Sequence, residues 1–219
     1  MLTIEILPVL SDNYTYLLHC PETGESAVVD PPDAQAVIRR LDERGWNLSS
    51  LLCTHHHVDH VAGVAELATK YGVEIFAWHG DCARIPGDCT PIDEATTIRV
   101  GASQGRVLFV PGHTSGHIAF YFADSSALFC GDALFCGGCG RLFEGSADDL
   151  YTALNVTLGE LPDQTRVYCG HEYTESNLRF ALSVEPDNDD LRARVSVARA
   201  IRERGEPTIP STLGLERRT

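Results

Sequence analysis

Short apolar or alternating runs, broken by Pro, Gly, Asp and Asn, dominate the first two thirds of the chain. Such runs are typical of β-strands between tight turns. They predict strands at Thr3–Leu7, Tyr14–His19, Ser26–Asp30, Leu48–Thr54, Glu74–Trp78, Arg106–Val110, Ile118–Phe122, Ala127–Cys130 and Arg166–Cys169. Asp33 is a typical N-cap for a helix that extends through Arg44 and is closed by Gly45. A second helical pattern covers Val61–Tyr71.

The pattern changes after Asp148, where helical spacing of apolar residues prevails. It predicts helices over roughly 147–159, 175–184 and 189–204. Strands followed by helices indicate an α/β protein in which helices cover the sheets. Residues Pro207–Thr219 show no periodicity and look like a tail cut from something longer.

The composition fits one large domain, or a domain with a short appendage. The chain has 219 residues, of which 43% are hydrophobic and 22% charged, enough for a substantial core. No stretch approaches the ~18 apolar residues of a membrane span, and the N-terminus lacks the basic and apolar regions of a signal peptide. We therefore expect a cytoplasmic protein with no membrane partner.

The eight cysteines do not predict a disulfide framework, because no secretory signal accompanies them. Cys53 and Cys130 lie inside apolar runs and are interpreted as small buried residues. Cys136 and Cys139 have the spacing of a redox or zinc-ribbon pair, but a ribbon needs a second pair. We interpret this pair as structural.

The net charge of −14 argues against a nucleic-acid partner, since phosphate binding needs clustered positive charge. Residues 192–219 are an exception, with seven Arg against three Glu. This segment could receive an anionic small molecule, or it could simply form a solvated amphipathic helix. Composition alone leaves both interpretations open.

The segment Thr54–His60 carries four candidate metal ligands directly after a predicted strand. Residues two apart in an extended stretch point the same way, so His55 and His57 can approach one ion. Asp59 and His60 can face a neighbouring position as the chain turns into a helix. A cluster this dense costs solvation energy that a purely structural loop has no reason to bear.

Three more candidate ligands, His113, Asp132 and His171, each follow a predicted strand. His55, His57 and His113 suit one metal, Asp59, His60 and His171 suit a second, and Asp132 can bridge the two. Imidazole and carboxylate ligands without thiolate favour two divalent zinc ions, with iron or manganese as alternatives. His56 and His117 are interpreted as supporting or structural residues.

The ordered strings T-H-x-H-x-D-H, P-G-H-T-x-G-H, G-D and G-H-E-Y-T resemble the ligand motifs of the metallo-β-lactamase superfamily. The resemblance covers nearly the whole chain. It implies an αββα sandwich with the metals at one edge of the two sheets and with C-terminal helices. We expect a metal-binding domain over 1–172 and a helical substrate-binding segment over 173–219.

Within that superfamily, the segments at 137–145, 171–174 and 206–212 are similar to glyoxalase II. Those enzymes hydrolyse S-lactoylglutathione to D-lactate and glutathione in methylglyoxal detoxification. The resemblance implies that Arg141 meets the glycine carboxylate of glutathione and that Tyr173 hydrogen-bonds its backbone. Phe143 stands at a substrate-contacting position where many relatives have Tyr. Family members usually continue beyond the position of Thr219 with further basic contacts, so the C-terminus looks shortened.

The expected mechanism is attack on the thioester by hydroxide formed between two metals, with Asp59 and Asp132 as the catalytic carboxylates. A thiolate is a good leaving group, so no strong general acid is required. The expected partner is a small glutathione thioester, and we expect a monomer.

Two other hypotheses remain. A mononuclear iron persulfide dioxygenase of the same superfamily would use only His55, His113 and Asp132. A non-catalytic binding protein would need none of the ligands, although all seven are present. An RNA-processing role fits poorly with the acidic charge.

Overall fold

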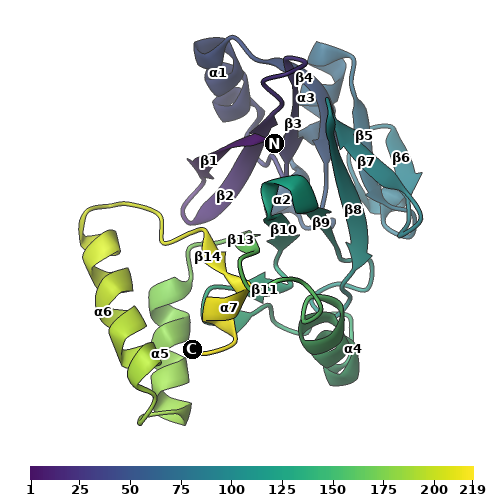
Figure 1. The fold of residues 1–219 in the computed structure, drawn as a ribbon. Helices are drawn as coiled ribbons and strands as arrows, with labels where there is room; N and C mark the ends of the chain where they lie inside the picture. Colours follow the sequence, from purple (N-terminus) through teal and green to yellow (C-terminus); the bar gives the residue numbers. More distant parts are fainter.

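The computed structural model describes residues 1–219 and contains two six-stranded mixed sheets that face each other (Figure 1). The first sheet has the order β1 (Thr3–Val9), β2 (Asn13–His19), β3 (Glu25–Val29), β4 (Asn47–Leu52), β5 (Glu74–Trp78) and β6 (Cys89–Ile92). The second has the order β14 (Ser211–Thr212), β13 (Arg166–Cys169), β10 (Ala127–Gly131), β9 (Ile118–Phe122), β8 (Ser103–Phe109) and β7 (Thr97–Val100). β11 (Leu134–Phe135) and β12 (Gly138–Cys139) form a separate small hairpin.

Alternating side chains on the strands of the first sheet build two cores. In β2, Tyr16 and Leu18 belong to the large cluster between the sheets, whereas Leu17 belongs to a second cluster. The second cluster lies against α1 (Ala34–Arg44) and α3 (Val64–Tyr71) on the outer face. The predicted α/β sandwich with flanking helices is confirmed.

The core between the sheets is aromatic and closely packed. Phe120, Phe122 and Phe129 from the second sheet are fully buried, and the rings of Tyr16 and Phe129 lie 5.3 Å apart. Residues from η3 (Ala153–Thr157), which continues α4 (Ala147–Thr152), join this cluster. This rigid interior holds the strand ends from which the ligand loops emerge.

Two C-terminal helices, α5 (Thr174–Val184) and α6 (Asp189–Glu203), project from the sandwich (Figure 1). Leu178, Leu191 and Ala198 pack between them as a small separate core. The chain then returns to the second sheet, where β14 pairs with β13 and α7 (Leu213–Glu216) follows. The sequence shows no periodicity over Pro207–Thr219, because elements of two to four residues are too short to show a period.

The helix predicted over 61–71 is two helices, α2 (Val58–Val61) and α3. They are separated at Gly63, where the backbone packs so closely on Pro31 that a Cβ would lie 2.7 Å from the Pro31 carbonyl oxygen. Strands β6 and β7 were not predicted. The three-residue helical turns η1 (Cys82–Arg84) and η2 (Ala123–Ser125) connect neighbouring strands.

One cysteine pair departs from the expectation of free thiols. Cys82 and Cys89 form a disulfide, because η1 turns the chain back onto β6 and leaves their Cα atoms 5.4 Å apart. Cys53 and Cys130 are free and buried, as predicted. Cys136 and Cys139 are also free, the first buried and the second exposed.

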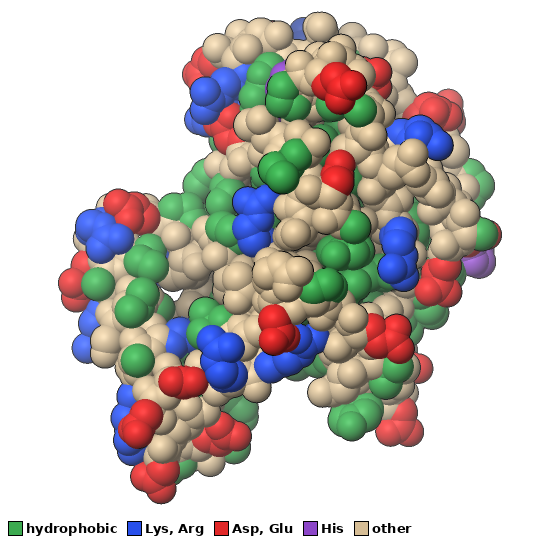
Figure 2. All heavy atoms as spheres, viewed as in Figure 1, with side chains coloured by type: hydrophobic (Ala, Val, Ile, Leu, Met, Phe, Trp, Pro, Cys, Tyr) green, Lys and Arg blue, Asp and Glu red, His purple; other side chains and the backbone are tan.

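Most arginines of the basic C-terminal segment are engaged in ion pairs within the protein. Six of its seven arginines contact a carboxylate: Arg192, Arg194, Arg202, Arg204, Arg217 and Arg218. Figure 2 shows acidic and basic side chains interspersed on the projecting helices. This favours the amphipathic-helix interpretation over an anion-binding patch. None of the helices has the length and apolar character needed to cross a membrane.

Candidate metal centre

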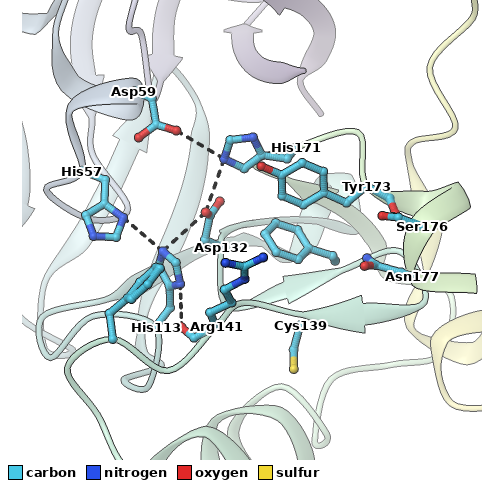
Figure 3. Close-up of a pocket in the computed structure, with 12 residues that line it drawn as sticks. His57, Asp59, His113, Asp132, Cys139, Arg141, His171, Tyr173, Ser176 and Asn177 are labelled. Carbon is cyan, nitrogen blue, oxygen red and sulfur yellow. Dashed lines mark hydrogen bonds and ion pairs between the residues drawn. The ribbon is translucent and has the colours of Figure 1, made fainter. Parts of the chain in front are cut away.

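The candidate ligands gather where strands of both sheets end, and five of them line a cavity of about 550 Å³: His57, Asp59, His113, Asp132 and His171 (Figure 3). β4 leads into the histidine-rich loop, β8 into the loop of His113, β10 into Asp132 and β13 into His171. A backbone hydrogen bond from Tyr14 to Gly170, 2.9 Å long, joins the two sheets at this edge.

The first ligand group consists of His55, His57 and His113. The Nδ1 atom of His57 lies 3.1 Å from Nε2 of His55 and 3.1 Å from Nε2 of His113. The three nitrogens all lie within 4.8 Å of one another, so one ion can reach them together. The sequence assigned the same three residues to one metal.

The second group consists of Asp59, His60 and His171, whose ligand atoms also lie within 4.8 Å of one another. Nε2 of His60 is 3.2 Å from Nε2 of His171, and Oδ2 of Asp59 is 3.5 Å from the same His171 atom. Asn13 donates a hydrogen bond of 3.1 Å to Oδ2 of Asp59 and so fixes this carboxylate.

Asp132 lies between the two groups (Figure 3). Its Oδ2 atom is 3.5 Å from Nε2 of His113 and 3.3 Å from Nε2 of His171, one residue from each group. Its Oδ1 atom is buried without a hydrogen-bond partner. A buried carboxylate oxygen without a partner is costly, and a metal ion would satisfy it. The residues therefore fit a two-metal site.

Oxygen atoms hold the second ring nitrogens of three candidate ligand histidines, His60, His171 and His113. Nδ1 of His60 donates to Asp30 (3.2 Å), Nδ1 of His171 to Asp12 (2.9 Å) and Nδ1 of His113 to the carbonyl oxygen of Arg141 (2.9 Å). Metal-binding histidines usually have such partners, which fix the tautomer and the ring orientation.

Sequence reasoning missed Asp12 and Asp30. Asp30 ends a predicted strand before Pro31 and adopts a positive φ of 48°, and it also accepts from the backbone and hydroxyl of Thr54. An acidic residue between a strand and a proline was the available signal. Asp12, in the turn after β1, had no sequence signal that could have identified it.

His56 and His117 stand outside the two ligand groups. Nε2 of His117 accepts a hydrogen bond of 3.1 Å from the backbone N–H of Asp132. Burial lowers the pKa of His117 to about 3, so the ring is a neutral acceptor. His56 contacts Asp81 through Nδ1 at 3.0 Å.

Protonation differs between the groups. Burial, aided by neighbouring histidines, lowers the pKa of His55 well below its ordinary value, and the pKa values of His57 and His113 are also lowered. Burial opposes the charged form of His60, but Asp132, Asp30 and Asp59 outweigh it and raise its pKa to about 9. The first group thus presents neutral imidazoles, and the second concentrates negative charge that favours a cation.

Glycine provides space beside the centre. A Cβ atom on Gly170 would lie 2.2 Å from Oδ1 of Asp132, and one on Gly140 would lie 1.9 Å from the carbonyl oxygen of Asp132. Any side chain at either position would displace the residue that lies between the two groups.

The three residues expected to contact substrate, Arg141, Phe143 and Tyr173, all line the cavity (Figure 3). Phe143 is 63% exposed, and its ring lies 5.2 Å from that of His113. Tyr173 stacks on His171 with the ring centres 4.7 Å apart. The cavity is also lined by three residues that the sequence did not single out, Phe135, Ser176 and Asn177, and by Cys139, which was interpreted as structural.

Comparison with known proteins places this chain in a family. The profile of the metallo-beta-lactamase superfamily matches residues 10–171, and that of the hydroxyacylglutathione hydrolase C-terminus matches residues 172–219. The chain is 50% identical to the hydroxyacylglutathione hydrolase of a Synechococcus strain, over 97% of this chain and 84% of the relative. It belongs to the hydroxyacylglutathione hydrolases of the metallo-β-lactamase superfamily. The resemblance inferred from the motifs is confirmed, and the chain is a hydrolase of this family.

Two further relatives carry the same name, and two solved structures are similar in fold. Hydroxyacylglutathione hydrolases of Methylococcus capsulatus and Rhodospirillum rubrum are 50% and 48% identical, over 99% and 100% of this chain and 84% and 85% of the relatives. The structure of ETHE1 from Myxococcus xanthus is 30% identical, with a TM-score of 0.70 over 78% of this chain and 76% of that one. The structure of TTHA1623 in a di-iron-bound form is 28% identical, with a TM-score of 0.64 over 77% and 91%.

Proposed function

We propose that this hydrolase cleaves S-lactoylglutathione to D-lactate and glutathione at a centre of two divalent metal ions. The observation that carries the proposal is the pair of three-ligand groups with Asp132 between them, at the base of a cavity that Arg141 also lines. The relatives named hydroxyacylglutathione hydrolase, about half identical to this chain, support the choice of thioester.

Zinc is the proposed metal for both positions, since imidazole and carboxylate ligands suit it, while iron or manganese are alternatives. His55, His57 and His113 would hold one ion, Asp59, His60 and His171 the other, and Asp132 both. Two ions bound there would supply Lewis acidity and would lower the pKa of water at the site.

Asp59 and Asp132 are the proposed catalytic carboxylates. Asp132 is buried, and its pKa lies well below its ordinary value because the charges of His60 and His171 outweigh the effect of burial. It therefore stays ionised at neutral pH and keeps both oxygens available. The side chain of Asp59 is 41% exposed and reaches the cavity from the solvent side.

The cavity wall suits a glutathione thioester. We assign Arg141 to the glycine carboxylate, Tyr173 to a hydrogen bond with the peptide backbone and Phe143 to an apolar contact. The leaving group is a thiolate whose conjugate acid has a pKa near ~8.5, so it departs without a strong general acid. The protein therefore does not need a side chain that protonates the leaving group.

The alternative persulfide dioxygenase would need only His55, His113 and Asp132. In this chain Asp59, His60 and His171 also bring their ligand atoms together, which favours the two-metal hydrolase. The intact ligand groups likewise count against a non-catalytic binding protein.

We further propose a cytoplasmic monomer whose residues 1–172 bind the metals and whose residues 173–219 help to bind substrate. The separate small core of α5 and α6 supports this division. The net charge of −14 supports a small-molecule partner over a nucleic acid.

The proposal is tested by comparing turnover of S-lactoylglutathione, other glutathione thioesters, a β-lactam and a glutathione persulfide. We expect rapid hydrolysis of the first, weaker activity on the other thioesters and no oxygen consumption with the persulfide. Preferential β-lactam hydrolysis, or oxygen uptake, would contradict the assignment.

A further inference from the structure

A disulfide-closed loop lies behind the candidate site and has no part in the function proposed above. Cys82 in η1 and Cys89 at the start of β6 are both partly exposed, and their bond closes residues 82–89 into a ring. The loop carries Arg84, and Asp81 precedes it directly. Neither of these charged residues lines the cavity of the metal centre.

Asp81 and Arg84 connect this loop to the loops around the metals. Asp81 is buried, contacts His56 at 3.0 Å and packs on the backbone of Gly116, where a Cβ would lie 2.4 Å from its Cγ atom. The guanidinium of Arg84 forms a two-point contact with Glu144, one branch of which is 3.1 Å long. Arg84 is also 3.5 Å from Asp81.

Glu144 belongs to the segment 141–145, which contains the proposed substrate contacts Arg141 and Phe143. It also accepts hydrogen bonds of 2.9 Å from the backbone and hydroxyl of Ser115. The hydrogen bond with Arg84 is the largest of the influences that hold the pKa of Glu144 well below its ordinary value, so this carboxylate is charged at neutral pH.

The segment is fastened to the ligand loop at three further points. Gly145 N–H donates to the Gly112 carbonyl at 3.0 Å, and Phe143 N–H donates to the His113 carbonyl at 3.4 Å. His113 Nδ1 donates to the Arg141 carbonyl at 2.9 Å. Arg141 and Phe143 are exposed, so these contacts and the Glu144 network are what fixes their backbone.

We propose that the Cys82–Cys89 disulfide is a thiol-sensitive brace for substrate binding. It holds Arg84 on Glu144 and thereby positions the segment that carries Arg141 and Phe143. Arg84 is a positioning residue in this scheme, since it acts through Glu144 and does not touch substrate. The inference rests on the proposed function, because it assigns these two residues to the glutathione portion of the substrate.

The chemistry that would release the brace is thiol–disulfide exchange. A small thiolate attacks one sulfur of the pair and forms a mixed disulfide, and the second protein sulfur leaves as a thiolate and takes up a proton. A second small thiol then displaces the other protein sulfur. Two small thiols are oxidised to their disulfide, and the protein disulfide is reduced to two cysteine thiols. Glutathione, the product of the proposed reaction, is a thiol of this class.

Release should weaken substrate binding and spare the metals. The candidate ligands His60 and His171 are held by Asp30 and Asp12 on the other side of the centre, and the direct hydrogen bond from His113 to the Arg141 carbonyl involves neither the disulfide nor Arg84. An ion pair at this degree of exposure changes binding by about two- to fivefold at most. The expected effect is therefore a rise of that size in KM, with kcat and metal content unchanged.

The test uses the full chain in four forms besides wild type: a Cys82→Ser/Cys89→Ser double variant, Arg84→Ala, Arg84→Lys and the control Arg44→Ala. Arg44 is a half-exposed arginine of α1 that pairs with Glu5 of β1. The first two variants should raise KM for S-lactoylglutathione about two- to fivefold. Arg84→Lys should recover part of the loss, since it retains the charge but not the two-point contact. Arg44→Ala should match wild type.

Two further readouts separate positioning from general loosening. Combined with Arg141→Ala, the Arg84→Ala change should add little, because both act on the same contact. Wild type treated with glutathione, then freed of it without air, should acquire the KM of the double cysteine variant, whereas that variant should not respond. An unchanged KM in both the cysteine and Arg84→Ala variants, or a loss of metal in them, would overturn the inference.

Failure of the proposed function would look different. If wild type does not hydrolyse S-lactoylglutathione, amide hydrogen exchange over 141–145 still tests whether the disulfide and Arg84 hold this segment in place. Faster exchange in the double cysteine and Arg84→Ala variants, but not in Arg44→Ala, supports it. Equal exchange in all five proteins would contradict it.

Discussion

Three of the five candidate ligand histidines are each oriented by a single oxygen atom at the second ring nitrogen. Asp30 holds His60, Asp12 holds His171 and the Arg141 carbonyl holds His113. Such partners typically change metal affinity or activity by about 10- to 100-fold when removed. The quality of the centre therefore depends on residues that touch no metal.

Asp12→Ala should lower the affinity of the second metal position by about 10- to 100-fold and leave the first position unchanged. The side chain of Asp12 is 38% exposed, so its loss leaves no buried void. Competition with a chelator of known affinity measures the two sites separately. Asp187→Ala, at a fully exposed aspartate, is the matched control. Equal weakening of both sites would argue against a specific role for Asp12.

Arg141→Ala should raise KM for S-lactoylglutathione and change kcat little. The glycine carboxylate lies far from the scissile thioester, so its contact contributes equally to ground state and transition state. A hydrogen bond to a charged group corresponds to about ten- to hundredfold in binding. Added salt should weaken binding in wild type more than in the variant. A fall in kcat at constant KM would show that Arg141 belongs to the chemistry instead.

At the scale of elements, α1 is attached to the edge strand β1 by charge. Glu5 pairs with Arg40 and with Arg44, the latter at 2.7 Å. Burial opposes ionisation of Glu5, but the two arginines outweigh it and lower its pKa. A carboxylate with a depressed pKa stabilises the fold above its unfolded-state pKa, and this contribution is lost as pH falls through the folded-state value.

Glu5→Gln should therefore destabilise the metal-free protein by about 1 kcal/mol at pH 7, the upper range for pairs near the surface. The difference from wild type should shrink as pH falls below ~4.3, the ordinary pKa of Glu. Urea unfolding at several pH values in the presence of chelator measures it. A difference that is constant with pH would point to packing in place of charge.

Elements with clear end signals were predictable from sequence. α1 begins after Asp33 and ends at Gly45 as predicted, because the Asp33 side chain accepts from Ala36 N–H and Gly45 adopts the left-handed conformation. β6 was missed, since Pro91 interrupts a short edge strand whose pairing with β5 only the fold reveals. The candidate ligands were predictable because they cluster in segments that follow predicted strands. The partners Asp12 and Asp30 and the Cys82–Cys89 bond depend on contacts between distant segments, which leave little local pattern.

At the scale of the whole molecule, the C-terminal segment ties the helices α5 and α6 to the sandwich. Glu216 in α7 pairs with the buried Arg194 of α6, with one contact of 2.9 Å, and accepts from the backbone N–H of Gly137 at 2.7 Å. Gly137 lies in the β11–β12 hairpin that borders the cavity. One carboxylate thus connects three parts of the chain.

Glu216→Ala should destabilise the protein by about 3–5 kcal/mol, because it leaves the Arg194 charge buried and unpaired. Thermal unfolding compared with Glu206→Ala, which removes an exposed pair with Arg204, isolates the effect of burial. Similar, small losses in both variants would show that Arg194 finds other partners.

The central claim is that two metal ions act together at this edge of the sandwich, and stoichiometric reconstitution tests it most directly. Metal-free protein is titrated with Zn²⁺ while bound metal and hydrolysis of S-lactoylglutathione are measured on the same samples. The account predicts two tightly bound ions per chain and full activity only at the second equivalent. Asp132→Ala should lose most of the activity because it removes the carboxylate between the two ligand groups. Full activity in wild-type protein with a single bound ion would contradict the account.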